Sequence, residues 1–188
     1  PIPNQAHWHV LHNINQWDQY VHGGCVEDIW LAFSAILQIF PQTKDHLGFL
    51  GTSFGGGIGA MALAWDQRIQ RGHLNVPSFG HHPMRLELPT HGSAASVQAF
   101  NRKHPEIAQK TLSYYDAAIA AQYIKIPMLN ACALQDPCVA PPGQFAIHNE
   151  IPSKKELFVL HGGHCDYPKK AVQEEQLHHK LNTFFEPL

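Results

Sequence analysis

Hydrophobic and polar positions along this chain follow the two repeats that indicate helices and buried strands. Apolar residues at 26, 29, 30, 33, 36, 37 and 40 have helical spacing and Pro41 follows, which predicts an amphipathic helix from Cys25 to Phe40. Short apolar runs predict strands near 47–51, 69–76, 126–133 and 156–160. Further helices are predicted up to Trp65 and over 94–101, 105–115, 143–149 and 169–185, and residues 1–20 are expected to be a loop.

Strands that alternate with helices predict an α/β fold, a mostly parallel sheet with helices on both faces. Residues 78–118 begin with His, Pro and Gly and continue with helical patterns, which predicts a helical insertion over the sheet. The 188 residues are 44% hydrophobic and 15% charged, the composition of an ordinary globular domain. We therefore expect residues 1–188 to form a single domain.

The charge balance and the cysteine and histidine patterns exclude several classes of protein. A net charge of −2 provides no electrostatic basis for binding nucleic acid or an anionic membrane, and the longest apolar stretch, 29–40, is too short to cross a bilayer. The fifteen histidines include no H-E-x-x-H and no pair with a further ligand at metal spacing, so neither metal nor cofactor is expected. Four cysteines without C-x-x-C spacing indicate a reduced, intracellular protein. Either contact between Cys138 and Cys165 or separate buried thiols would fit the sequence.

The segment Gly51-Thr52-Ser53-Phe54-Gly55 lies between a predicted strand and a predicted helix. This pattern is typical of a nucleophile elbow, in which a serine with strained backbone geometry exposes its hydroxyl at the top of a sheet. The glycines on either side of Ser53 are expected because a Cβ on Gly51 or Gly55 would collide with the neighbouring strand and helix. The segment therefore makes Ser53 a candidate nucleophile.

Two further residues follow predicted strands and provide chemical partners for Ser53. Asp136 comes after the third strand and His164 after the fourth, and the order Ser, Asp, His is that of α/β-hydrolases. His164 is the candidate general base, Asp136 would orient its imidazole, and the backbone N–H of Phe54 would supply half of an oxyanion hole. The competing interpretations are Ser53 as a helix cap, Asp136 as a turn residue, and His161 as the base, since it flanks the same glycine pair.

Several segments together resemble one known family, the acetyl xylan esterases and cephalosporin C deacetylases of carbohydrate esterase family seven, within the α/β-hydrolases. The resemblance covers the carboxyl-terminal part of that family and runs from about Tyr20 to the end of the chain. The matching segments are 51–57, 66–69, 76–79, 111–116, 125–127, Asp136 with Pro141, 145–146, 155–157 and 163–164.

The resemblance implies a serine esterase that removes short acyl groups, chiefly acetyl, from sugar hydroxyls, with Ser53, Asp136 and His164 in the triad positions. It further implies a cytoplasmic, metal-independent protein that binds a small acetylated saccharide and forms a homo-oligomer, often a hexamer. The chain departs from the family pattern at Phe54, where glutamine is usual, at Cys165, where glutamate is common, and at 85–88, which is less basic.

A further departure concerns the amino-terminal strands of the family and the tyrosine loop whose amide completes the oxyanion hole. Nothing before Tyr20 matches that region. The strand that leads to Ser53 is therefore expected to be an unprotected sheet edge, which favours pairing with another copy. We interpret the chain as a partial α/β-hydrolase domain whose amino-terminal strands are missing.

Three functions follow as hypotheses. The first is an acetyl esterase for acetylated sugars such as xylo-oligosaccharides, with cephalosporin C as a further substrate and an acyl-serine as intermediate. The second is a general short-chain carboxylesterase of the same fold. The third is a catalytically incomplete fragment that serves as an oligomerisation or binding module.

Overall fold

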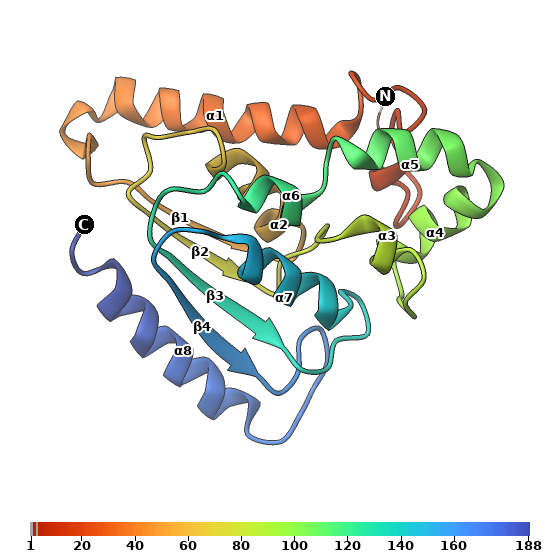
Figure 1. Cartoon of the computed structure of the whole chain (residues 1–188). Coiled ribbons are helices and arrows are strands. Elements are labelled where there is room, and N and C mark those ends of the chain that lie inside the picture. Colours follow the sequence, from red (N-terminus) through yellow and green to blue (C-terminus); the bar gives the residue numbers. More distant parts are fainter. Residues whose placement is uncertain (1, 3) are drawn as a thin grey trace.

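The computed structural model describes residues 2 and 4–188, and its centre is a sheet of four parallel strands in the order β1-β2-β3-β4 (Figure 1). The strands are β1 (Gly48–Thr52), β2 (Arg71–Asn75), β3 (Met128–Ala133) and β4 (Lys155–Leu160). Each is within two residues of its predicted position. The predicted α/β class, a parallel sheet with helices on both faces, is confirmed.

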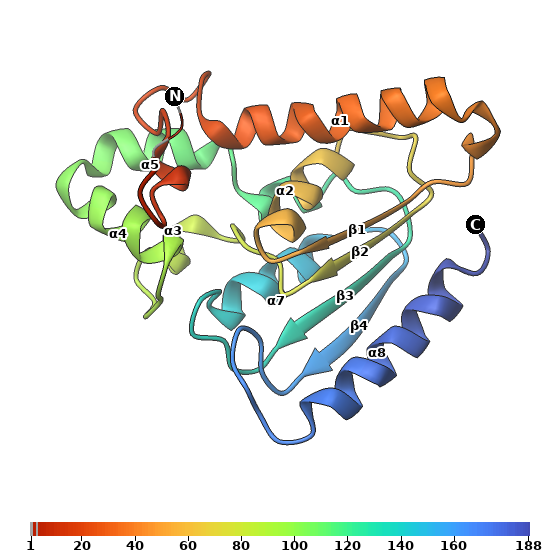
Figure 2. The ribbon, with the colours of Figure 1, turned by 180° about the vertical axis from the view of Figure 1, so that it is seen from behind.

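The helices form a layer on each face of the sheet (Figures 1 and 2). One face is covered by α2 (Phe54–Leu63), α6 (Ala117–Ala121) and α7 (Pro141–Glu150), and α1 (Val21–Ile39) packs on α2 from outside. The opposite face is covered by α8 (Lys170–Phe185). A short 3-10 turn, Pro41–Thr43, connects α1 towards β1. Among the described residues, no helix is long and apolar enough to cross a membrane.

The segment between β2 and β3 lies beyond the carboxyl ends of the strands (Figure 2). It contains α3 (His82–Arg85), α4 (Ser93–Lys103) and α5 (Pro105–Ser113), followed by α6. The predicted helices at 94–101 and 105–115 are confirmed as α4 and α5. The predictions missed α3 and α6, since helices of four and five residues are too short to show a helical repeat.

Over residues 4–20 the chain is irregular apart from a 3-10 turn at His9–Leu11, as the loop prediction implies. It is nevertheless well packed, because Val10, Ile14 and Tyr20 are buried in a cluster with Val97 of α4 and Leu112 of α5. Helix α1 begins at Val21, four residues before its predicted start.

Helix α2 packs very closely against the sheet because it is built from small residues. A Cβ on Gly59 would overlap the ring of Phe49 in β1, and one on Gly56 would approach Pro77 to 3.1 Å. The backbone of α2 therefore lies directly against the Phe49 ring of β1 and against Pro77. This close packing fixes the position of the turn that joins them, which carries Ser53.

Strand β1 forms one edge of the sheet, as expected from the sequence. It pairs only with β2, and no other described strand lies along its outer side. Leu50 in its middle is 56% exposed, and Thr52 at its end is exposed as well. At the start of β1, Phe185 of α8 and Leu188 lie close to the backbone of Gly48.

Candidate active site

Ser53 occupies a sharp turn between β1 and α2 and has strained backbone geometry. Its φ is 53° and its ψ is −114°, a conformation that costs a non-glycine residue about 1–3 kcal/mol. The turn is held by the end of β2, because the amide of Ser53 donates to the carbonyl of Asn75 at 2.8 Å and the amide of Ser78 donates to the carbonyl of Ser53 at 3.0 Å. The strain is thus maintained by neighbouring backbone, which is the arrangement of a nucleophile elbow.

The two glycines beside Ser53 have different surroundings. A Cβ on Gly51 would lie 2.5 Å from the carbonyl oxygen of Gly55, so the expected collision exists there. At Gly55 the expectation is wrong, because a Cβ would meet nothing within 4 Å. The physical reason is that Gly55 lies in the first turn of α2, beside which no described residue packs at that point.

The side chains of Ser53, His164 and Asp136 form a continuous hydrogen-bonded chain. His164 Nε2 lies 2.8 Å from Ser53 Oγ, and His164 Nδ1 lies 2.8 Å from Asp136 Oδ2. Since an ionised carboxylate can only accept, Nδ1 carries the proton and Nε2 is left to accept from the serine hydroxyl. The structure therefore brings together all three residues that the sequence singled out, although they are up to 111 residues apart.

Asp136 is held as an ionised carboxylate by several donors. Its side chain is fully buried. Oδ1 accepts from the amides of Cys138 and Val139, both at 2.9 Å. Burial alone would raise the pKa of the Asp136 carboxyl, but the hydrogen bonds from His164, Val139 and Cys138 outweigh it and lower the pKa below its ordinary value. Asp136 shapes its own turn as well, so the two roles considered for it coexist.

Gln144 in α7 is a member of this site that sequence reasoning missed. Its side chain is completely buried, and its Nε2 donates to Asp136 Oδ2 at 3.1 Å and to the carbonyl of Val139 at 2.8 Å. Its Oε1 accepts from the amide of Ala133 at 2.8 Å, which ties the end of β3 to α7. The only signal in the sequence was a polar residue beside an apolar helical run, Phe145-Ala146-Ile147.

The loop after β4 places His164, and not His161, beside Ser53. His161 is exposed, its amide donates to Gln173, and its ring lies 6.2 Å from that of Tyr167. Between the two histidines, a Cβ on Gly163 would overlap Asp136 Oδ2, so only glycine fits at this position. The amide of Gly163 also donates to the carbonyl of Gln135 at 2.7 Å, which joins the two loops.

Phe54 begins α2, where the first backbone N–H groups of a helix have no acceptor within the helix. Its ring contacts those of His22, Phe79 and His9, with centroid distances of 5.7, 5.3 and 5.8 Å. These aromatic contacts hold the Phe54 ring in place. The backbone N–H of Phe54, next to Ser53, remains available as a donor to a substrate oxygen.

The four cysteines are all free thiols. Burial is the main cause of a raised pKa at Cys138, and the neighbouring Asp136 and Cys165 add to it. Within the described part of the chain, no three side chains of metal-binding type come together.

A parallel sheet followed by an elbow serine, with an aspartate and a histidine after later strands, defines an α/β-hydrolase. Comparisons with known proteins identify the branch of this class. The sequence model of the acetyl xylan esterase family, AXE1, matches residues 2–183, and the chain belongs to that family. The expected start of the resemblance at about Tyr20 was wrong, because the match begins at residue 2.

Solved structures show the same fold at low sequence identity. An acetyl xylan esterase from Paenibacillus sp. R4 is 24% identical with a TM-score of 0.73, and the match covers 91% of this chain and 55% of that one. Acetyl xylan esterase 1 from Thermoanaerobacterium sp. JW/SL YS485 is 23% identical with a TM-score of 0.61, and the match covers 73% of this chain and 46% of that one. An acylaminoacyl peptidase from Pyrococcus horikoshii is 13% identical with a TM-score of 0.67, and the match covers 86% of this chain and 27% of that one. The chain thus spans about half the length of the two esterases.

Proposed function

We propose that the chain acts as a serine esterase that removes acetyl groups from acetylated sugars through an acyl-serine intermediate. The observation that carries this proposal is the hydrogen-bonded chain from Asp136 through His164 to Ser53 on a strained elbow. Membership of the acetyl xylan esterase family supports acetyl as the acyl group. Xylo-oligosaccharides are the proposed substrates, and cephalosporin C is a further candidate with an acetyl ester.

Ser53 is the proposed nucleophile, and its alcohol is activated by the neighbouring base. As Ser53 Oγ attacks the acetyl carbonyl carbon, His164 Nε2 takes the hydroxyl proton and the buried Asp136 carboxylate stabilises the imidazolium. The C–O bond to the sugar then breaks, and His164 returns the proton to the departing alkoxide. Water, activated by His164 in the same way, attacks the acyl-serine and releases acetate.

The negative charge that develops on the carbonyl oxygen needs preorganised donors. The Phe54 N–H at the positive end of α2 is the proposed first donor. Loss of one oxyanion donor costs roughly 10²–10³ in rate, so a site with a single donor is expected to acylate slowly. A second donor is expected to come from a polypeptide that packs beside Ser53.

We also propose that β1 pairs with a second copy of the chain. The outer edge of β1 has unpaired backbone groups, and Leu50 is 56% exposed there. Natural proteins seldom leave such an edge uncovered, because it is a template for pairing. Pairing alone would not separate the esterase from the third function, a catalytically incomplete fragment that serves as an oligomerisation or binding module, so the two are distinguished by activity.

Two measurements test the esterase proposal. The chain is expected to release a burst of p-nitrophenol from p-nitrophenyl acetate and to be labelled by a serine-directed phosphonate, and Ser53→Ala removes both signals. Absence of burst and label in the unaltered chain would show that it is not an esterase. Faster turnover of acetylated xylotriose than of simple alkyl acetates is expected, and the reverse order would favour the general carboxylesterase.

A further inference from the structure

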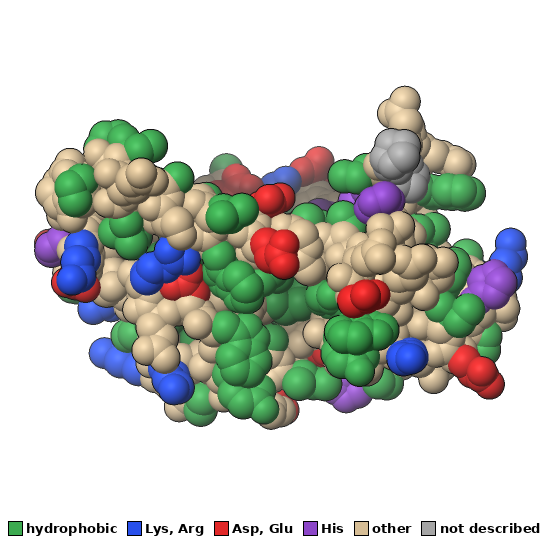
Figure 3. Space-filling view, turned by 90° about the horizontal axis from the view of Figure 1, so that it is seen from above, with side chains coloured by type: hydrophobic (Ala, Val, Ile, Leu, Met, Phe, Trp, Pro, Cys, Tyr) green, Lys and Arg blue, Asp and Glu red, His purple; other side chains and the backbone are tan. Residues whose placement is uncertain are grey.

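A groove away from the triad lies between α1, the end of α2 and α6. It has a volume of about 280 Å³, and none of its lining residues belongs to the triad. Figure 3 looks onto the side of the molecule on which α1 lies, where hydrophobic side chains gather near the middle and basic side chains lie mostly towards the ends. The aromatic residues that line the groove are Trp30, Trp65, Tyr114, Tyr115 and Tyr123.

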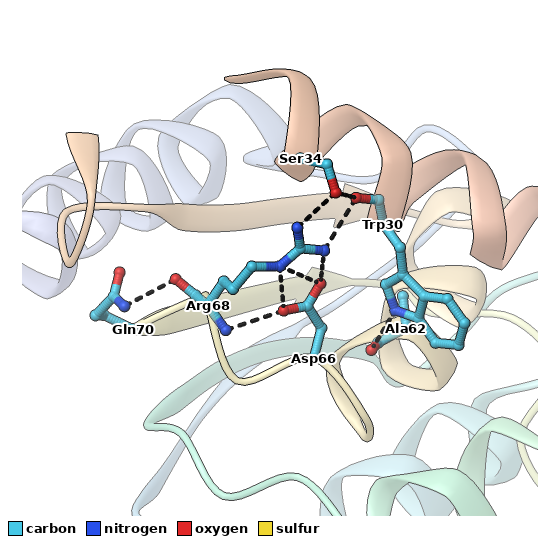
Figure 4. A network of polar contacts seen from close by, with 6 residues as sticks. All are labelled: Trp30, Ser34, Ala62, Asp66, Arg68 and Gln70. Carbon is cyan, nitrogen blue, oxygen red and sulfur yellow. Dashed lines mark hydrogen bonds and ion pairs between the residues drawn. The ribbon is translucent and has the colours of Figure 1, made fainter. Parts of the chain in front are cut away.

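Three of the aromatic residues, Trp65, Tyr114 and Tyr123, are exposed, and several of the rings are held in place by neighbours. Trp65 is 61% exposed, and its ring stacks on that of Tyr123 with centroids 4.7 Å apart and an interplanar angle of 29°. Trp30 Nε1 donates to the carbonyl of Ala62 at 3.1 Å (Figure 4). Tyr114 stacks on Trp17 at 4.6 Å. A ligand that stacks on these rings would therefore meet a preformed surface and lose little affinity to their ordering.

The charges around the groove favour a neutral ligand. No lysine or arginine lines it, and its acidic residues are Glu27 and Asp116. The Asp116 carboxylate accepts from the amides of His81, His82 and Ala118, so it is already satisfied. Phosphates, nucleic acids and anionic lipids need cationic partners that this groove does not offer.

A second hollow continues the groove, because Trp30 and Trp65 line both. The second hollow, of about 390 Å³, also includes Arg68, but this guanidinium is neutralised and occupied. It forms an ion pair with Asp66 and donates to Ser34 Oγ and to the carbonyl of Trp30 (Figure 4). The two hollows thus adjoin at Trp30 and Trp65, and together they are called the aromatic trough.

We propose that this aromatic trough binds the sugar chain of the substrate at a site separate from the triad. The apolar C–H faces of pyranose rings stack on aromatic rings, and their hydroxyls hydrogen-bond to carboxylate and phenol groups such as those of Glu27 and Tyr123. The expected ligand is a neutral xylan chain without acetyl groups. The proposal rests on the proposed function for its ligand class, because the sugar chain expected here is that of the proposed substrate.

The test measures binding without catalysis. The full chain carrying Ser53→Ala is mixed with insoluble, chemically deacetylated xylan, and the fraction that sediments is measured against polymer concentration. Trp65→Ala and Tyr123→Ala are each expected to weaken binding by about tenfold, the upper end of what one aromatic contact contributes. Trp65→Phe keeps a stacking ring and is expected to retain most of the binding. Trp8→Ala, an exposed tryptophan outside the trough, is the matched control and should bind normally.

Several outcomes would overturn this inference. They are no sedimentation with xylan, unchanged binding by Trp65→Ala and Tyr123→Ala, or an equal loss in Trp8→Ala. A change in molar mass by light scattering in Trp65→Ala without a change in xylan binding would assign the trough to contact between protein copies instead. Because deacetylated xylan contains no ester and Ser53 is absent, the result is independent of phosphonate labelling of the unaltered chain, so the two proposals fail separately.

Discussion

Gln144→Glu provides the sharpest test of how the site is held, because it changes one atom of a completely buried side chain. The introduced carboxyl keeps the acceptor for the Ala133 amide but replaces the Nε2 donor, which lies 3.1 Å from Asp136 Oδ2 and 2.8 Å from the Val139 carbonyl. When protonated, it can still donate to one of these oxygens. When ionised, it places a second negative charge against Asp136 in a buried environment.

The size of the effect follows from the burial and from the neighbouring carboxylate. Both raise the pKa of the introduced carboxyl, by roughly 3 units from its ordinary value of about 4.3. The introduced carboxyl therefore has a higher pKa in the folded chain than in the unfolded chain. The variant keeps its full stability below the pKa of the unfolded chain and loses stability as pH rises through the pKa of the folded chain. At 1.36 kcal/mol per unit, the loss approaches about 4 kcal/mol at pH 8, a large part of the stability of a typical domain.

The assay is urea unfolding followed by circular dichroism at pH 5 and pH 8. Gln144→Glu is expected to unfold close to the unaltered chain at pH 5 and at much lower urea at pH 8. Gln176→Glu, on the exposed side of α8, is the matched control and should behave alike at both pH values. Equal destabilisation of Gln144→Glu at the two pH values, or none, would refute the view that Gln144 serves as a donor to a buried, ionised Asp136.

Four other predictions follow from the site and the sheet. Gly163→Ala is expected to reduce esterase activity at least about 10²-fold by displacing the Asp136–His164 contact, whereas Gly55→Ala, with open space around it, should keep its activity; equal effects in the burst assay would contradict this. His164→Ala is expected to abolish the acylation burst, because Ser53 loses its base, and His161→Ala should keep it; the opposite result in the burst assay would exchange their roles. Asp136→Asn should flatten the loss of stability on acidification, because the lowered pKa of Asp136 stabilises the fold above about pH 4 and this contribution disappears as pH falls; an unchanged acid unfolding curve would argue against it. Leu50→Lys should reduce the molar mass by light scattering without changing stability by more than about 0.5 kcal/mol, and an unchanged oligomer would exclude pairing through β1.

Much of the fold could be predicted because apolar runs such as those of β3 and α2 are evident in the sequence. All four strands and the helices α1, α4, α5, α7 and α8 follow patterns that are local in the sequence. The meeting of Ser53, Asp136 and His164 could be anticipated as well, since the carboxyl ends of parallel strands share one edge of a sheet. The family resemblance agreed with both.

The parts that could not be predicted depend on contacts between distant segments. Asp116 caps α6 and also accepts from the amides of His81 and His82, 35 and 34 residues away, and no local pattern encodes this. Gln144 acts through side-chain geometry in the same way. At Gly55 a rule about elbow glycines failed because a collision requires a neighbour, and the described chain has none there. Oligomeric state, localisation in the cytoplasm and substrate preference stay predictions.

The open edge of β1 also separates the activation of Ser53 from the binding of the ester beside it. Asp136 and His164 reach Ser53 from β3 and β4, on the paired side of β1. Any polypeptide that joins the free side can therefore change without disturbing how the serine is activated. The residues that activate the serine lie between positions 53 and 164. The residues that bind the ester would then lie in the polypeptide that covers the free side of β1. Such a division makes the covering part replaceable, so that one activated serine can be combined with different neighbours.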